Sequence, residues 1–235
     1  MCIRDSLGVA RARGEIIVFT DADCVPEPGW LAAHLARQAA GETVVGGSVR
    51  YDSDNYWSLS DNLSMFHECD PGLPAGPRDY LPTLNLSVTR EAFEAAGPMD
   101  PDLPRGEDLD WTIRAAARGH RPFFEPAAGL WHRPTRTDAR AMWDHWYQSG
   151  RWMPGVRRRH AGVLDAPAWL RYPELVLLLT PAIASIATAR LYGPGKPGRR
   201  HWRTLPAVFV TKLAWALGAC RPIEVPARSP ASDGG

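Results

Sequence analysis

Two aspartates stand where a strand is expected to end. Asp21 and Asp23 directly follow the run Ile16–Thr20, whose apolar, β-branched composition predicts a buried strand. In an α/β sheet, ligands gather at the carboxyl ends of the strands. Two carboxylates this close repel each other unless a cation or a proton lies between them. Their hard oxygen ligands suit Mg²⁺ or Mn²⁺, which keep open positions for substrate phosphates.

The Asp-x-Asp spacing alone is weak evidence for a metal. The chain is rich in aspartate, and the spacing occurs four times, at 21/23, 52/54, 100/102 and 108/110. Only the first pair follows an apolar strand. The alternative is that Asp21 and Asp23 are loop residues that cap a helix starting at Trp30. Cys24, next to the pair, is interpreted as a small core residue in preference to a nucleophile.

A second acidic cluster, Glu107, Asp108 and Asp110, begins a predicted helix. A helix N-terminus favours carboxylates through its dipole, and this explains one or two of the three. It does not explain why acidic residues follow a glycine-containing turn at two separate elements of the chain.

The surrounding pattern alternates strands and helices. We expect strands over residues 16–20, 44–51 and 81–88, and an extended segment from Phe123 to His132. We expect the end of a helix over residues 8–13, closed by Gly14, and helices over 30–40, 89–96 (with Thr89 as N-cap) and 107–118. Residues 52–80 are polar, aromatic and rich in Gly and Pro, and are interpreted as a surface excursion. This order predicts a three-layer α/β/α domain with a largely parallel sheet.

Charge divides the chain in two. Residues 1–150 carry 14 basic and 22 acidic side chains, and residues 151–235 carry 13 and 4. The acidic part argues against a nucleic-acid partner and suits a metal. Four scattered cysteines without CxxC spacing argue against a zinc site or disulfide scaffold.

Two uncharged or nearly uncharged runs follow in the basic part. Residues 175–189 carry no charge and lie between Arg171 and Arg190, and Leu205–Ala219 contains only Lys212. Basic flanks favour insertion into, or docking on, a membrane surface. The alternative is a pair of ordinary core helices, because fifteen residues are short for a span.

Several segments together resemble family-2 glycosyltransferases. Residues 14–23 (GEIIVFTDAD) look like that family's metal-binding strand. The segments 85–93 (NLSVTREAF), 97–100 (GPMD) and 106–111 (GEDLDW) resemble its acceptor side and catalytic helix. The resemblance covers residues 7–135. It implies the A-type nucleotide-sugar transferase fold and an inverting transfer of a sugar from a nucleotide-diphosphate donor to an acceptor hydroxyl.

The resemblance also implies roles for particular residues. Asp21 would lie near the ribose and the metal, and Asp23 would ligate Mg²⁺ or Mn²⁺ at the donor diphosphate. Asp108 would be the general base, and Glu107 would hold the acceptor. Further residues are carried over with the family pattern: His132 as a metal ligand, Asn85 as a sugar contact, and Arg151 and Trp152 as an acceptor platform within residues 143–152 (WDHWYQSGRW). For that last segment, an amphipathic helix over the active site or on the membrane is the favoured alternative.

The expected organisation follows from these parts. Residues 7–150 would be the catalytic domain, 151–222 a basic, helical, membrane-associating region, and 223–235 a disordered tail. Family members begin with further strand–helix units that hold the nucleobase, so we expect a domain incomplete at its N-terminus. Residues 1–6 would be a non-native leader, too short and polar for a signal peptide. The implied partners are a nucleotide-diphosphate sugar, a sugar or lipid-linked acceptor of the cell envelope, and the cytoplasmic face of the inner or plasma membrane.

Two other functions fit parts of the pattern. Residues 16–25 (IIVFTDADCV) also resemble the first motif of haloacid-dehalogenase-like phosphatases, in which the first aspartate is the nucleophile. That family needs a lysine between its acidic motifs, whereas Lys196 and Lys212 both follow every candidate acid. The other possibility is an inactive, membrane-associated sugar-binding module, which metal binding through Asp21 and Asp23 would argue against.

Overall fold

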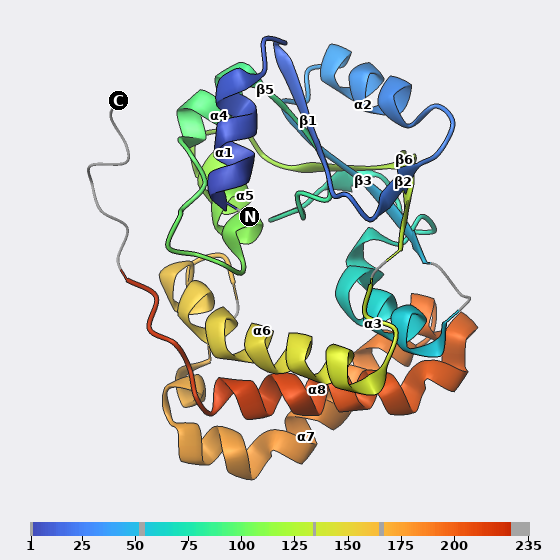
Figure 1. Cartoon of the computed structure of the whole chain (residues 1–235), viewed down its shortest axis with the longest axis vertical. Coiled ribbons are helices and arrows are strands. Elements are labelled where there is room, and N and C mark those ends of the chain that lie inside the picture. Colours follow the sequence, from blue (N-terminus) through green and yellow to red (C-terminus); the bar gives the residue numbers. More distant parts are fainter. Residues whose placement is uncertain (1, 52–54, 134, 165–166, 227–235) are drawn as a thin grey trace. The chain divides into compact units, whose positions relative to one another are not determined.

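The computed structural model describes residues 2–51, 55–133, 135–164 and 167–226. Its contacts divide the chain into two compact units, each built from separated segments (Figure 1). The first comprises residues 1–49, 73–130 and 225–235, and the second comprises residues 50–72 and 131–224. The functional boundary at residue 150, expected from composition, stays a prediction.

The first unit is a mixed sheet flanked by helices. Its strand order is β1-β5-β3-β6-β2, with β4 paired to β6. The strands are β1 (Ile16–Thr20), β2 (Cys24–Pro26), β3 (Val44–Tyr51), β4 (Gly76–Pro77), β5 (Asn85–Thr89) and β6 (Phe123–His132). The helices are α1 (Cys2–Arg11), α2 (Trp30–Ala39), α4 (Arg90–Ala96) and α5 (Glu107–Ala117).

The expectation of a largely parallel sheet is wrong for the pairings that define the site edge. β5 lies between β1 and β3 and runs antiparallel to both, with Thr20 opposite Asn85 and Gly46 opposite Leu86. β4 also pairs antiparallel with β6. β5 ends at Thr89, opposite Ile16 at the start of β1, and leads directly into α4. The end of β1 therefore lies beside the start of β5, which brings Asp21 and Asn85 to the same edge.

β5 is buried on both faces. Leu86 and Val88 face one side and are fully buried. The alternate residues Asn85 and Ser87 face α2 and are equally buried. Successive side chains of a strand point to opposite faces of the sheet, so a strand covered on both faces buries both sets of residues. Polar side chains on that face survive burial only because each is hydrogen-bonded.

The second unit is helical. α8 lies between α6 and α7 and also packs on α3 (Figure 1). Three small clusters, centred on Met142 and Trp146, on Leu63 and Val208, and on Leu170 and Val176, form its apolar core. Its elements are α3 (Tyr56–Phe66), η1 (His67–Cys69), α6 (Ala139–Arg159), η2 (Ala168–Arg171), α7 (Pro173–Tyr192), η3 (Pro197–Thr204) and α8 (Leu205–Ala219).

Most expected elements are confirmed. β1, β3 and α8 coincide with their predicted bounds, and Thr89 accepts a hydrogen bond from the Ala92 amide as the N-cap of α4. Glycines follow three of the helix ends with positive φ, namely Gly41, Gly97 and Gly119, as helix termination favours. The strand expected from residue 81 begins only at Asn85. Residues 2–6, expected to be a leader that fits no element, form part of α1.

The surface excursion expected over residues 52–80 is wrong where the structure describes it. Residues 56–66 form α3, and most of its polar side chains are buried, among them Ser58, Ser60, Asp61, Asn62 and Ser64. Composition misled because each of these side chains has a partner elsewhere in the same unit or on its own helix. Asp52 and Asp54, like most of the tail expected to be disordered (227–235), lie outside the described residues.

Candidate active site

The turn after β1 carries the first pair of acids. It is closed by the amide of Cys24, which donates to the carbonyl of Asp21 at 3.1 Å. The side chains of Asp21 and Asp23 are both half-buried. Burial, together with the charges of the two carboxylates, raises the pKa of the neighbouring Cys24 thiol to about 12. The thiol is therefore protonated at neutral pH. A nucleophilic cysteine needs the thiolate form, so this supports the interpretation of Cys24 as a packing residue.

These acids fit only one kind of metal site. Among the residues that the structure describes, no three His, Cys, Asp or Glu side chains gather as a ready-made cage. Mg²⁺ characteristically takes one or two carboxylates and completes its shell with water and substrate phosphates. Asp21 and Asp23 can supply these carboxylate ligands, and a diphosphate can supply the remaining ones.

His132, expected to be a metal ligand, lies at the end of β6 in the second unit and is buried. The Asn62 amide nitrogen donates to the His132 carbonyl at 3.1 Å, so the amide oxygen faces the ring nitrogen Nδ1. Nδ1 must then carry the proton, which leaves Nε2 as the basic nitrogen of the neutral ring. Ligating histidines are held in this way by a second-shell acceptor. The ligand role stays a prediction, because Asp21 and Asp23 belong to the other unit.

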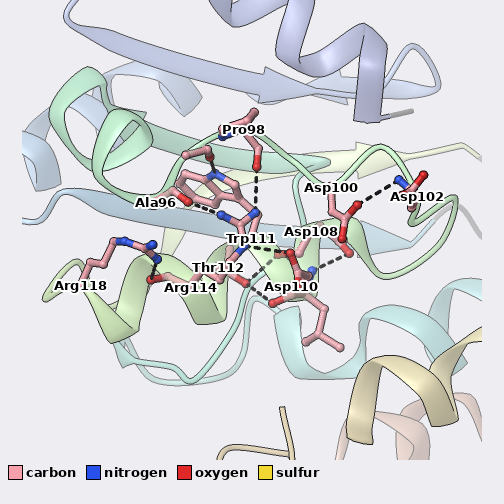
Figure 2. Close-up of polar contacts among 12 residues, drawn as sticks. Ala96, Pro98, Asp100, Asp102, Asp108, Asp110, Trp111, Thr112, Arg114 and Arg118 are labelled. Atoms are coloured by element: carbon pink, nitrogen blue, oxygen red, sulfur yellow. Dashed lines mark hydrogen bonds and ion pairs between the residues drawn. The ribbon is translucent and has the colours of Figure 1, made fainter. Parts of the chain in front are cut away.

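The second acidic cluster opens α5, and its three acids differ in their surroundings (Figure 2). Gly106 begins the helix with φ of 78°, a conformation that glycine adopts without strain. Asp110 is completely buried and bonds to Arg114 at 2.9 Å. Glu107 is also buried, whereas Asp108 is half-buried. Asp108 is thus the acid of this cluster with most access to a substrate.

Arg114 and Trp111 fasten the loop that precedes the cluster. The Arg114 guanidinium donates to the carbonyls of Ala96 and, at 2.9 Å, of Pro98. The Trp111 indole donates to the Gly97 carbonyl at 2.9 Å. Figure 2 shows these side chains reaching from α5 to the start of the loop. The Asp110–Arg114 pair is thereby structural, and it fixes where the first turn of α5, with Asp108, lies.

The backbone of that first turn is also held. The Asp108 carboxylate accepts from the Leu109 amide at 2.8 Å, and the Thr112 hydroxyl donates to the Asp108 carbonyl at 2.8 Å. The helix N-terminus stabilises negative charge on Asp108. An anionic, half-exposed carboxylate is what a general base requires.

An aromatic stack ties the two acidic segments together. The rings of Phe19 on β1 and Phe93 on α4 lie 6.4 Å apart, and Phe93 lies 5.4 Å from Trp111 on α5, both pairs stacked. Phe19 precedes Asp21 by two residues, and Trp111 follows Asp108 by three. The stack therefore connects the strand end that carries one acid pair with the helix start that carries the other. Sequence reasoning missed it, because aromatic residues on three elements carry no common spacing.

Asn85, expected to contact a sugar, uses its whole amide inside the first unit. Its oxygen faces the Trp30 indole at 2.8 Å and His34 Nε2 at 2.9 Å. Its nitrogen donates to the carbonyls of Ser48 at 2.9 Å and Ala128 at 2.8 Å. An asparagine amide has two donors and two lone pairs, so a direct sugar contact would break one of these four bonds. These bonds give Asn85 a structural role at this junction, and its contact with a sugar stays a prediction.

Gly47 on β3 and His34 on α2 complete that junction. A Cβ at Gly47 would overlap the Ala128 carbonyl and the Asn85 amide, so only glycine admits them. Burial lowers the pKa of His34, which keeps the ring neutral and able to bond to both Asn85 and Ser87. Nothing in the spacing of residues 34 and 85 indicates this junction.

Arg151 and Trp152, the expected acceptor platform, lie on α6 in the second unit. Arg151 donates to the Arg221 carbonyl at 3.3 Å, and its own carbonyl accepts from Ile223 at 2.8 Å. Trp152 is half-buried, and the platform role stays a prediction. The alternative of a membrane-lying or site-covering α6 also stays a prediction; the apolar stripe of Met142, Trp146, Gly150 and Pro154 on this helix is buried, and α6 packs largely against α8.

Comparisons with known proteins agree with the motifs. The model "Glycosyl transferase family 2" matches residues 6–93, which include β1, Asp21 and Asp23 but end before α5. "Glycosyltransferase AglE" of Haloferax volcanii is 29% identical over 118 residues, which are 50% of this chain and 39% of that protein. "Pre-mycofactocin glycosyltransferase" of Mycobacterium tuberculosis is 26% identical over 175 residues, 71% of this chain and 34% of that protein.

Another relative is "Polypeptide N-acetylgalactosaminyltransferase 15" of Mus musculus, 28% identical over 149 residues, 54% of this chain and 23% of that protein. The aligned residues span well under half the length of each of these curated relatives. All of them carry glycosyltransferase names, and the family model covers the strand and turn that hold the first acid pair. Residues 6–93 of the chain therefore match glycosyltransferase family 2, and the similarity to proteins with glycosyltransferase names extends over 50–71% of the chain.

Proposed function

We propose that this chain carries the transfer site of an inverting, divalent-metal-dependent glycosyltransferase. The donor would be a nucleotide-diphosphate sugar and the acceptor a hydroxyl group. The observation that carries the proposal is the pairing of two acidic segments in one unit, tied by the Phe19–Phe93–Trp111 stack. In a displacement at an anomeric carbon, the negative charge on the leaving group must be stabilised. The incoming hydroxyl must also lose its proton.

The first segment serves the donor in this proposal. Asp21 and Asp23 would hold Mg²⁺ or Mn²⁺ at the diphosphate, with Asp21 also near the ribose. The metal, when bound, supplies Lewis-acid stabilisation of the leaving diphosphate, an effect worth several kcal/mol. The metal-ligand role expected for His132 stays a prediction, because His132 belongs to the second unit and the two aspartates belong to the first.

The second segment serves the acceptor. Asp108 would take the proton from the acceptor hydroxyl as that oxygen attacks, and Glu107 would orient the acceptor. The choice of Asp108 over Asp110 rests on burial, because Asp110 is sealed in its ion pair with Arg114. A general base typically contributes about 10²–10⁴-fold in rate.

The phosphatase alternative loses its support. The family match does not favour it, and no lysine lies in the first unit. Lys196 and Lys212 both lie in the second unit, and Lys212 lies over the Trp146 ring at 4.6 Å. The inactive-module alternative predicts no donor-dependent metal binding, so it is separated from the transferase by experiment.

The test measures binding of Mn²⁺ by calorimetry, with and without a panel of nucleoside diphosphates, to the chain and its Asp23→Asn variant. We expect nucleotide-dependent Mn²⁺ binding that Asp23→Asn weakens at least tenfold. The matched control is Asp79→Asn, which removes an exposed carboxylate of the same unit. Equal Mn²⁺ binding by the two variants would falsify the metal role. Hydrolysis of nucleotide sugars, screened in parallel, identifies the donor.

The acceptor class is proposed more broadly, as a sugar or a lipid-linked sugar of the cell envelope at the cytoplasmic face of the membrane. Support comes from the exposed apolar face of α7, which suits a protein that works beside lipid.

A further inference from the structure

Two helices of similar apolar composition, α7 and α8, differ in how much of their surface is buried in the second unit. α8 packs on α3, α6 and α7, and seven of its fifteen residues are buried. α7 has its main contacts with α8, η2 and η3, and large apolar side chains remain exposed along it. Among the described residues, α7 is also the one helix long and apolar enough to be a candidate membrane span.

α7 has one covered stripe and one open stripe. Val176, Thr180, Ala184, Thr188 and Leu191 recur every three or four residues and are buried. Leu178, Ala182, Ile186 and Arg190 recur every four residues on the opposite side and are exposed. Leu178 is 76% exposed and Ile186 is 56% exposed. A large, continuous apolar surface of this kind is unusual on a monomer and marks an interaction site.

The ends of the open stripe are basic and aromatic. Arg171 and Tyr172 lie exposed before the helix, and Arg190 ends the stripe. η3, which packs on the end of α7, adds an exposed Trp202 between basic neighbours. Those neighbours are Arg199, Arg200 and Arg203, all exposed. The one acidic residue of α7 is Glu174.

We propose that the open face of α7 docks on the surface of an anionic lipid bilayer, with α7 lying in the plane of the membrane. Leucine and isoleucine side chains would enter the acyl boundary, Tyr172 and Trp202 would lie at the headgroups, and the arginines would meet lipid phosphates. This is the arrangement of an interfacial helix, with apolar area and basic charge acting together. The proposal stands whether or not the transferase assignment holds.

The covered stripe argues for docking over spanning. Twenty residues rise about 30 Å, enough to cross the hydrocarbon core, so length does not decide. The stripe from Val176 to Leu191 carries two threonines and lies against the rest of the unit along the whole helix. A span would pull the packed α8 into lipid as well, together with Lys212, which donates to the Ser64 carbonyl at 3.2 Å. In-plane docking leaves these contacts intact.

The test is flotation of the full chain with vesicles of phosphatidylcholine, with and without phosphatidylglycerol. We expect binding to the anionic vesicles that weakens in high salt. Leu178→Glu and Ile186→Glu should each reduce the partition coefficient about tenfold or more. Leu31→Glu is the matched control, because Leu31 is a 47% exposed leucine on α2 of the other unit, and it should bind as the parent chain does.

The basic rim is tested separately. Arg171→Gln and Arg190→Gln should each lower the partition coefficient on anionic vesicles about fivefold. Arg140→Gln, an exposed arginine of α6, should lower it less. Circular dichroism and melting curves check that each variant folds, which the exposure of the substituted side chains leads us to expect.

Four results would overturn the proposal. One is binding that does not distinguish neutral from anionic vesicles. Another is equal binding by Leu178→Glu and Leu31→Glu. The third is protein that resists extraction from the vesicles by alkaline carbonate, which would mean a spanning helix. Sedimentation identifies a further contradictory case, in which Leu178→Glu abolishes self-association and leaves vesicle binding unchanged.

Discussion

The two units bury polar side chains for different purposes. In the first unit, the Asp110–Arg114 pair and the Asn85 amide hold loops and strand ends beside the candidate acids. In the second unit, Asp61 on α3 bonds to Arg136 at 2.6 Å and to the Trp146 indole at 2.7 Å. There the buried polar groups join α3 to α6 and to the segment before it.

This difference shows how burial separates candidates that sequence alone treats as equal. Asp61, Asp108 and Asp110 are all aspartates on helices. Asp61 and Asp110 are sealed in ion pairs, whereas Asp108 keeps access to solvent. A buried, paired carboxylate contributes to structure and cannot exchange a proton with a substrate. We therefore expect substitutions in the two units to affect different measurements.

The largest effect is expected for Asp108→Asn in the first unit. Sugar transfer, measured with the donor found by the hydrolysis screen, should fall about 10²–10⁴-fold, because the side-chain amide of asparagine cannot act as the base. The melting temperature should change little, since the side chain is half-exposed. The Asp79→Asn variant should keep its activity. Undiminished transfer by Asp108→Asn would remove this residue from the base role.

Asp110→Ala should destabilise the chain instead. Removing Asp110 takes away the buried carboxylate that offsets the charge of the Arg114 guanidinium, a loss of about 3–5 kcal/mol in unfolding free energy. Urea denaturation measures it. The matched control in the second unit is Asp144→Ala, from an i,i+4 pair with Arg140 that is largely exposed. Such exposed pairs contribute little, so similar losses for both variants would contradict the assignment of Asp110 as a structural anchor.

The packing of the second unit can be tested at its closest helix crossing. A Cβ at Gly150 on α6 would overlap the Trp215 carbonyl of α8, and one at Gly218 on α8 would overlap the Tyr147 carbonyl of α6. Gly150→Ala should therefore cost about 1–3 kcal/mol through overpacking. Gly8→Ala in α1 of the first unit meets nothing within 4 Å and should stabilise by about 0.5–1 kcal/mol. A stabilising Gly150→Ala would mean that the helices separate at this point.

The last effect concerns pH. Burial lowers the pKa of Lys212 from 10.5 to about 8, despite the opposing charges of Asp61 and Glu68. Between these pH values the unfolded chain binds more protons than the folded chain, so unfolding free energy should rise with pH from about 8 to 10.5, by at most about 1.4 kcal/mol per pH unit. Lys212→Met should lose this rise, measured as the difference between the two urea titrations. Parallel pH dependences would show that Lys212 is not desolvated.

The sequence by itself determined the local elements and the identity of the candidate acids. An apolar β-branched run marked β1, a loose alternation of residue types marked β3, and the Thr89 and Gly97 signals bounded α4. These signals are local, because backbone conformation and capping depend on neighbouring residues. The Asp21–Asp23 pair and the acids of α5 could be recognised for the same reason. The pair directly follows a predicted strand, and the acids begin a predicted helix.

Only the tertiary structure decided which of these residues is buried, and against what. The antiparallel insertion of β5, the sealed state of Asp110, the four bonds of Asn85 and the burial of α3 all depend on partners far away in the sequence. The same holds for α7 and α8, whose compositions are alike and whose surroundings are not. Burial is a property of the assembled unit, because it depends on which distant surfaces meet, and a local pattern carries no record of that.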